Sequence, residues 1–281
     1  MPKNIDARAT PRAPQWASGE VTIVETSSAP GVSAQAAAAA LSDPVARWTL
    51  PVRRWAYRQM GAASTAKPET GIVDPMLRRR LSPLARLALS AAMACGPLPA
   101  ACRVVYASQH GEIQRTTQML EALVRGEPPS PTAFSLSVLN ATPGVLSISR
   151  DDHSAINAIA ASDDTLGYAL LDAWTQHAES PDAPLLVIHA FEAPPACYGP
   201  TARQSGDSPH ALALLIEPGA TARLTCTMRL PAGRDTSAEP RVQCDSLVTS
   251  LLGGGADTWH GERHDWQFEW YEQEGTPHAD R

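Results

Sequence analysis

Short apolar runs alternate with segments of helical period along the middle of the chain. Residues 82–95 predict a helix, because Ser82 is a favourable N-cap and Pro83 suits the first helical position. Helices are also predicted at 112–124 and from 162–164 onward, the latter with an inward stripe of Leu166, Ala169, Leu170, Ala173 and Trp174. Apolar runs of strand length occupy residues 103–107, 145–148, 184–189 and 211–216. This alternation is typical of an α/β layered domain with a sheet covered on both faces.

The two ends of the chain differ from this middle part. Residues 1–32 are rich in Pro, Ser, Ala and Thr around one β-like run, so we predict a flexible N-terminal arm. Residues 33–271 are predicted to form one domain, with an exposed loop at 62–70 and a polar tail after Gly253. Residues 272–281 are predicted to be a disordered tail.

Composition and charge exclude several classes of protein. The 281 residues are 43% hydrophobic, which is enough for one substantial core. The net charge is -6 with no basic stripe, so nucleic-acid binding is not indicated. No segment approaches the roughly 18 uninterrupted apolar residues of a membrane span, and the start does not resemble a signal peptide. We therefore expect a cytoplasmic protein.

Cysteine and histidine positions give no metal or redox signature. The 5 cysteines are irregularly spaced and include no CxxC, so we predict neither disulfides nor a zinc site, and no other metal or cofactor. They are interpreted as small hydrophobic residues. Seven histidines are scattered and have no evident catalytic partner: His110, His153, His177, His189, His210, His260 and His264. The last two lie in the polar tail.

Five ordered segments, however, resemble a known family. They are residues 77–89, VYASQHGE at 105–112, residues 130–140 with FSLSVLN at 134–140, GVLSI at 144–148, and AASDD at 160–164. With the aromatic ending WQFEW at 266–270, they resemble the β-ketoacyl synthase-like N-terminal domain family. Its members in aryl polyene and xanthomonadin-type pigment clusters are called chain length factors. The resemblance covers roughly residues 33–271.

This resemblance implies a thiolase-like α/β fold that corresponds roughly to the N-terminal half of a condensing enzyme. Complete members place a nucleophilic cysteine at the start of a buried helix, and two histidines of the second half assist it. The motifs place that position on Ala161 or Ser162, and neither is a thiol. The nearest cysteines, Cys102 and Cys197, do not follow the expected strand. The resemblance therefore implies a subunit with no catalytic residue.

Other residues receive a role only from the resemblance. Those expected to line or gate an acyl tunnel, or to contact a partner, are Glu112, Ile113, Phe134, Val138, Leu139 and Thr142. For the apolar ones, ordinary core and interface packing is an almost equal alternative. Family members often carry histidine at the position of Leu139, which places a polar role there in question. A methylene too many in such a tunnel costs about 1–3 kcal/mol, so side-chain volume would set product length.

The expected partner is a full-length β-ketoacyl-acyl carrier protein synthase, in a heterodimer that also works with acyl carrier protein. Half a thiolase fold would expose a strand edge within 156–161, and a homodimer is the less favoured outcome. One alternative is a stand-alone acyl hydrolase or transferase that uses Ser162, although its flanks do not match a G-x-S-x-G turn. The other is a scaffold that binds acyl carrier protein through Arg78, Arg79 and Arg80.

Overall fold

The computed structural model describes residues 43–60, 71–199, 208–231 and 243–271. Several predicted segments lie outside the described residues: the arm at 1–32, almost all of the alanine-rich start of the predicted domain, the loop at 62–70 and the tail at 272–281. The division of the chain into arm, domain and tail therefore stays a prediction.

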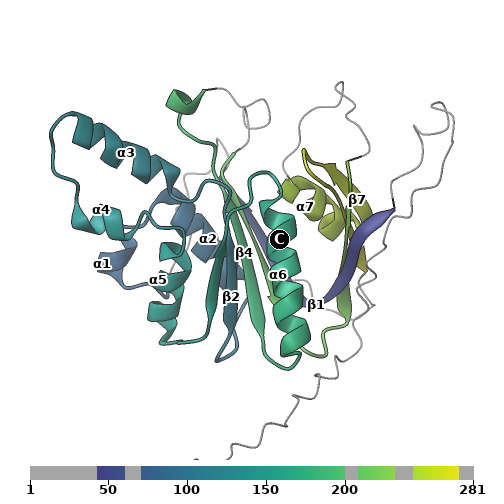
Figure 1. Cartoon of the computed structure of the whole chain (residues 1–281). Coiled ribbons are helices and arrows are strands. Elements are labelled where there is room, and N and C mark those ends of the chain that lie inside the picture. Colours follow the sequence, from purple (N-terminus) through teal and green to yellow (C-terminus); the bar gives the residue numbers. More distant parts are fainter. Residues whose placement is uncertain (1–42, 61–70, 200–207, 232–242, 272–281) are drawn as a thin grey trace, which may run out of the picture.

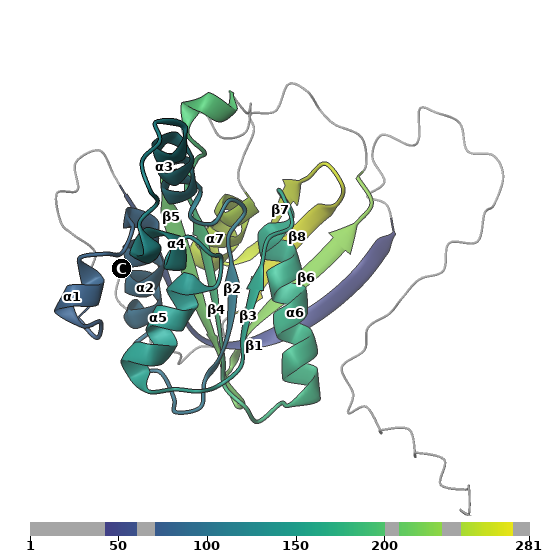
Figure 2. The same cartoon turned by 60° about the vertical axis from the view of Figure 1, so that its left-hand side comes forward.

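One mixed β-sheet organises the described part of the chain (Figure 1), with the strand order β3-β2-β4-β5-β1-β6-β8-β7. The strands are β1 Pro44–Gln59, β2 Arg103–Ala107, β3 Ile156–Ile159, β4 Leu185–Phe191, β5 His210–Ile216, β6 Ala222–Arg229, β7 Gly255–His260 and β8 Asp265–Tyr271. Strand β2 pairs in parallel with both β3 and β4, and the other neighbours are antiparallel. Strand β3 forms one edge of the sheet; Figure 2 shows it beside α6.

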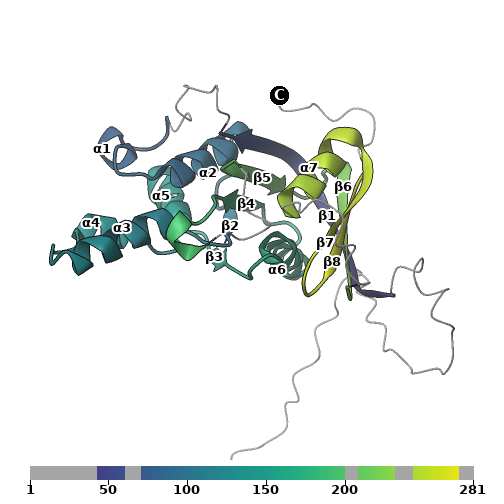
Figure 3. The same ribbon diagram turned by 90° about the horizontal axis from the view of Figure 1, so that it is seen from above.

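Helices cover both faces of this sheet (Figure 3). They are α1 Pro75–Arg78, α2 Pro83–Ala94, α3 Ile113–Val124, α4 Pro131–Ser135, α5 Ala141–Arg150, α6 Thr165–Glu179 and α7 Gln243–Gly253, with a 3₁₀ turn η1 at Ala196–Tyr198. Helices α2 and α5 pack on one face, whereas α6 and α7 pack on the other, and each face has its own apolar core. None of the described helices is both long and apolar enough to cross a membrane.

Several predicted elements are confirmed. Helix α2 begins as predicted, because the Ser82 hydroxyl accepts a hydrogen bond of 2.9 Å from the backbone N–H of Ala85. Helix α6 begins at Thr165, and of the predicted stripe Leu166, Ala169, Leu170 and Ala173 are 0% exposed, whereas Trp174 is half-buried. Strands β2, β4 and β5 occupy the predicted apolar runs, and all residues of β4 and β5 are buried.

The strand predicted at 145–148 is wrong, because these residues lie within helix α5. Thr142, Val145 and Leu146 are among its four buried residues, at helical spacings of three and four from Thr142. A four-residue apolar run does not distinguish a strand from part of a buried helix. The predicted helix at 112–124 is confirmed as α3, but its apolar residues Leu120 and Val124 are exposed.

The longest strand, β1, was not predicted. Its first half pairs with β6 and its second half with β5, so it joins the two parts of the sheet. The polar tail expected after Gly253 is also wrong, since strands β7 and β8 form a hairpin that extends the sheet. Trp266, Phe268 and Trp270 of β8 are buried at a spacing of two.

Candidate functional site

A sharp turn connects strand β3 to helix α6, and both residues proposed for the nucleophile position lie in it. Ala161 is half-buried, whereas Ser162 is exposed and adopts the left-handed conformation, with φ of 53°. The hydroxyl of Thr165 donates a 2.6 Å hydrogen bond to the Ser162 carbonyl and accepts one of 2.9 Å from the Ala161 N–H. The turn therefore leads directly from a strand into a helix, and it carries no thiol.

The surroundings of the Ser162 hydroxyl do not activate it. Within the described ranges, no imidazole forms a hydrogen bond with this hydroxyl. The neighbouring carboxylates take separate partners: Asp163 accepts a 2.8 Å hydrogen bond from the Gln109 side chain, and Asp164 points into the core. This arrangement resembles neither a serine hydrolase nor an acid/base pair.

Asp164 anchors the start of α6 to the C-terminal hairpin. Its side chain is 1% exposed and accepts a 2.6 Å hydrogen bond from the indole N–H of Trp266. The His264 ring nitrogen lies 3.8 Å from its other oxygen. Burial raises the pKa of the Asp164 carboxyl, although the Trp266 hydrogen bond and His264 oppose that shift. The expectation that His264 lies in a polar tail is therefore wrong.

Three of the six predicted tunnel residues come together near the end of β2. Glu112 is 5% exposed and accepts hydrogen bonds of 2.7 Å from the Ser82 hydroxyl and 3.2 Å from Arg115 Nε. Thr142 is 3% exposed and lies at Tyr106, where burial raises the pKa of the phenol and hydrogen bonding with Thr142 opposes the shift. Leu139 packs close to Gly111, 3.2 Å from where a Cβ would stand.

The other three predicted tunnel residues lie closer to the protein surface. Ile113 is half-buried at the first position of α3, whereas Phe134 and Val138 are 65% and 45% exposed. A hollow beneath α5 is lined by Leu146, Arg150 and Ile156 among others, and none of the six predicted residues contributes to it. In the described part of the single chain, Phe134 and Val138 therefore face solvent, and their predicted tunnel role depends on a partner.

Glu192, the residue after β4, was not predicted from the sequence as a candidate site residue. Burial raises its pKa to about 7, and the nearby Glu112 carboxylate contributes in the same direction. An acidic side chain directly after an apolar run is the only sequence signal that could have marked it. Two carboxyl groups thus share a poorly solvated region beside Tyr106.

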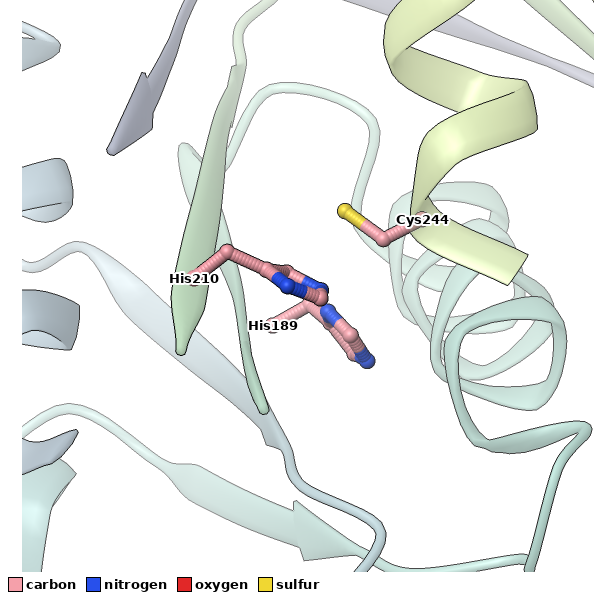
Figure 4. Close-up of side chains that lie close together, drawn as sticks. All are labelled: His189, His210 and Cys244. Carbon is pink, nitrogen blue, oxygen red and sulfur yellow. The ribbon is translucent and has the colours of Figure 1, made fainter. Parts of the chain in front are cut away.

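A second cluster lies on the opposite face of the sheet, where His189, His210 and Cys244 converge (Figure 4). Their candidate ligand atoms all lie within 4.8 Å of one another. The expectation that these histidines are scattered is wrong for His189 and His210, because adjacent strands bring them together. The Nδ1 atom of His189 and the Nε2 atom of His210 are buried and have no hydrogen-bond partner within the described residues. An unsatisfied buried polar group costs about 1–3 kcal/mol.

The cysteines otherwise behave largely as expected. All five are free, and four of them are buried: Cys95, Cys102, Cys226 and Cys244. Cys197 is exposed, contrary to the interpretation of all five as buried apolar residues. Burial raises the pKa of the Cys244 thiol. One thiol, once deprotonated, and two imidazoles form a set of donors for a soft or borderline metal ion, whereas nothing in the described residues suggests an organic cofactor.

Comparison with known proteins identifies the family. The model of the family "Beta-ketoacyl synthase, N-terminal domain" matches residues 52–271, which is most of the chain. The chain belongs to this family. No curated protein matches the sequence significantly.

Solved structures of β-ketoacyl synthase proteins share the fold. One is the ketosynthase ApeO in complex with its chain length factor ApeC from Xenorhabdus doucetiae, with 25% identity and a TM-score of 0.67. That match covers 79% of this chain and 99% of the matched chain. The ishigamide ketosynthase/chain length factor matches with 16% identity and a TM-score of 0.51, over 65% of this chain and 67% of that chain. The predicted thiolase-like α/β fold is therefore confirmed, and the chain is a ketosynthase-like subunit.

Proposed function

We propose that this chain is a non-catalytic chain length factor, which pairs with a complete β-ketoacyl-acyl carrier protein synthase in aryl polyene biosynthesis. The observation that carries the proposal is the turn between β3 and α6. It leads from a strand into a buried helix, as the resemblance implies for the nucleophile position, and Ala161 and Ser162 stand where the family's cysteine is expected. Condensation must then occur at the thiol of another subunit.

The free edge of β3 supports a partner strand at this place. The Val104 N–H donates to the Ala155 carbonyl and the Ser108 N–H donates to the Ile159 carbonyl, so odd-numbered residues of this segment face β2. By the alternation of a parallel ladder, the backbone groups of Ile156 and Ala158 point away from the sheet. No other described strand pairs with them. Such an edge pairs readily with another chain.

Exposed apolar side chains between α3 and α5 also support a partner. Half of the large hydrophobic residues that are exposed in the described ranges lie on or between α3 and α5: Leu120, Leu123, Val124, Phe134, Val138 and Ile148. Figure 1 shows α3 and α4 projecting from the layered core. Apolar surface concentrated in this way is typical of a protein–protein interface.

The matched chain of the Xenorhabdus doucetiae complex supports the type of partner. That complex consists of a ketosynthase and its chain length factor. The match takes in 99% of one of its chains. A heterodimer of the same kind gives Phe134 and Val138 a partner surface. Glu112 and Thr142 are already buried in this chain, and Ile113 and Leu139 are half-buried. The proposed tunnel wall is thus completed only in the complex.

The mechanism we propose is steric. The partner's cysteine carries the growing acyl chain and its histidines assist decarboxylation of the malonyl unit, while this chain supplies the far wall of the tunnel. Extension stops when the next unit no longer fits. A misfit of one or two methylenes costs about 1–3 kcal/mol, which changes the product ratio about ten- to hundredfold at each step.

The two alternatives have weaker support. A hydrolase that uses Ser162 needs a base beside the hydroxyl, and no described imidazole bonds to it, so a Ser162→Ala variant is expected to change no thioester hydrolysis. The scaffold alternative rests on Arg78, Arg79 and Arg80, all of which are exposed at the end of α1 and just after it. We assign these arginines to contact with the acidic acyl carrier protein within the heterodimer, without a separate scaffold function.

The test of pairing is co-expression of this chain with a complete synthase from the same organism, followed by size exclusion and extension assays with carrier-bound malonate. Co-elution and condensation that requires both chains are expected. Ala158→Pro removes the outward N–H of β3 and should abolish co-elution, whereas Ala158→Ser keeps that N–H and should not. A chain that never binds the synthase would refute the proposal.

The test of the tunnel uses the same complex. Val138→Trp is expected to shorten the products and Val138→Ala to lengthen them. Leu252→Trp is the matched control, because Leu252 is 65% exposed on α7, away from α3–α5. If the complex forms but all three variants give the same product lengths, pairing stands and the role in length control is refuted.

A further inference from the structure

The cluster of His189, His210 and Cys244 is built from three separate elements. Strands β4 and β5 are antiparallel, with His189 opposite Leu212 and His210 opposite Phe191, so the two histidines are diagonal neighbours on one face. Cys244 is the second residue of α7, which covers that face. Figure 4 shows the thiol extending from α7 to the side of the two rings. No sequence motif links these residues; only the register of the sheet brings them together.

The three side chains are closed off from solvent. His189 is 6% exposed, His210 is 2% exposed and Cys244 is 0% exposed. One ring nitrogen of each histidine is without a hydrogen-bond partner within the described part of the chain. Buried polar atoms in native proteins are nearly always paired, so these two nitrogens indicate a ligand.

The tautomer of the His210 ring is set by the backbone carbonyl of Ser208. Its Nδ1 atom lies 3.1 Å from the backbone carbonyl of Ser208, to which it donates a hydrogen bond. Nε2 of a neutral ring then carries a lone pair and faces the cluster. Metal-binding histidines are usually oriented by such a bond from the other ring nitrogen.

Imidazole nitrogens and a thiolate are the donor groups that bind a transition-metal ion, and a bound cation would strongly favour the thiolate of Cys244.

We propose that His189, His210 and Cys244 bind a single transition-metal ion, with Zn²⁺ the ion that two imidazoles and one thiolate fit best. Donor atoms around a tetrahedral zinc ion lie about 3.5 Å apart, and the three donors here need only a small contraction from their present separations within 4.8 Å. Binding releases the thiol proton to solvent. At least one coordination position is left for water or another group.

The site has a structural consequence. The side-chain oxygen of Gln243, next to Cys244, accepts a 2.9 Å hydrogen bond from the Gly167 N–H on α6. A metal ion would fasten the start of α7 to β4 and β5, a few residues from this contact. It would thus fix both helices that cover this face of the sheet. This inference is independent of the proposed chain length factor function.

The experiment uses the full chain, purified without a polyhistidine tag or chelators under reducing conditions. Metal content is measured by mass spectrometry, and Co²⁺ binding is followed by its thiolate charge-transfer absorption. About one ion per chain and a charge-transfer band are expected. Cys244→Ser should remove the band and weaken binding at least about a hundredfold, because even loss of an orienting partner costs about 10–100-fold. Cys226→Ser is the control, since Cys226 is equally buried but outside the cluster.

A second measurement does not depend on how the variants fold. X-ray absorption of the wild-type chain loaded with Zn²⁺ is expected to show one sulfur and two imidazole ligands. A zinc environment without sulfur would overturn the proposal. So would a wild-type chain that takes up no Zn²⁺ or Co²⁺, or a Cys244→Ser variant that binds Co²⁺ as the Cys226→Ser control does.

Discussion

Substitution of Gly167 by alanine tests how tightly α6 is held against the C-terminal hairpin. A Cβ at this position would lie 2.5 Å from Cδ2 and 2.6 Å from Cε2 and Cε3 of Trp266. The indole is 0% exposed, is held by its hydrogen bond to Asp164, and has Trp48 and Tyr168 rings 5.9 Å and 5.5 Å away. The Trp266 ring therefore has little space in which to move away from an added Cβ.

The expected size of this effect follows from two opposing contributions. Overpacking of a full core costs about 3 kcal/mol at the upper end of the usual range. Replacement of glycine by alanine within a helix returns about 1 kcal/mol. The net loss for Gly167→Ala is then about 2 kcal/mol, which corresponds to a decrease in Tm of about 4–8 °C for a domain of this size.

Gly144 on α5 provides the matched control. No atom lies within 4 Å of a Cβ added there, and its φ is not positive. Gly144→Ala should therefore raise the free energy of unfolding by about 0.5–1 kcal/mol. Thermal and urea denaturation, followed by tryptophan fluorescence and circular dichroism, measure both variants. If Gly167→Ala is neutral or stabilising like its control, the close packing of Trp266 on α6 is refuted.

Two further predictions concern the carboxyl groups beside Tyr106. The folded chain holds the proton of Glu192 up to about pH 7, above the usual 4.5, so its ionisation lowers stability as pH rises between these values. Glu192→Gln should then raise the free energy of unfolding by up to about 3 kcal/mol at pH 8 and leave it unchanged at pH 4; equal effects at both values would contradict this. Ser82→Ala removes both the N-cap of α2 and a hydrogen-bond donor to Glu112, so it should lower the free energy of unfolding, measured in urea, by about 1–3 kcal/mol. Ser130→Ala removes only an exposed N-cap and is the control, with an expected loss of about 1 kcal/mol.

Local patterns predicted the centre of the fold. The continuous apolar runs of β4 and β5 and the capped start of α2 are determined by nearby residues, so they can be identified from sequence. Strand β1 was not predicted, because Pro44, Pro51 and several arginines interrupt its apolar sequence. Its alternation from Arg47 to Arg53 was a usable signal, because Trp48, Leu50 and Val52 are buried between exposed or half-buried neighbours.

The candidate sites depended more on long-range geometry. The place of Ala161 and Ser162 in the turn between β3 and α6 could be expected from motif order, since these two elements are consecutive in the chain. The cluster of His189, His210 and Cys244 could not, because it requires the register of β4 on β5 and the docking of α7. The partners of Asp164 likewise come from a hairpin about a hundred residues later, which the sequence placed in a polar tail.

The backbone strain in the turn between β3 and α6 is itself an argument for a partner subunit. Ser162 holds a left-handed backbone conformation, which costs a non-glycine residue about 1–2 kcal/mol. With no thiol to present and no described imidazole bonded to the hydroxyl, chemistry in this chain does not explain that cost. The turn does place the exposed edge of β3 directly beside the start of α6, and Thr165 fixes both through the Ala161 N–H and the Ser162 carbonyl. A strained turn is maintained when the surface that it shapes has a function, and here that surface is the strand edge through which we propose the synthase is bound.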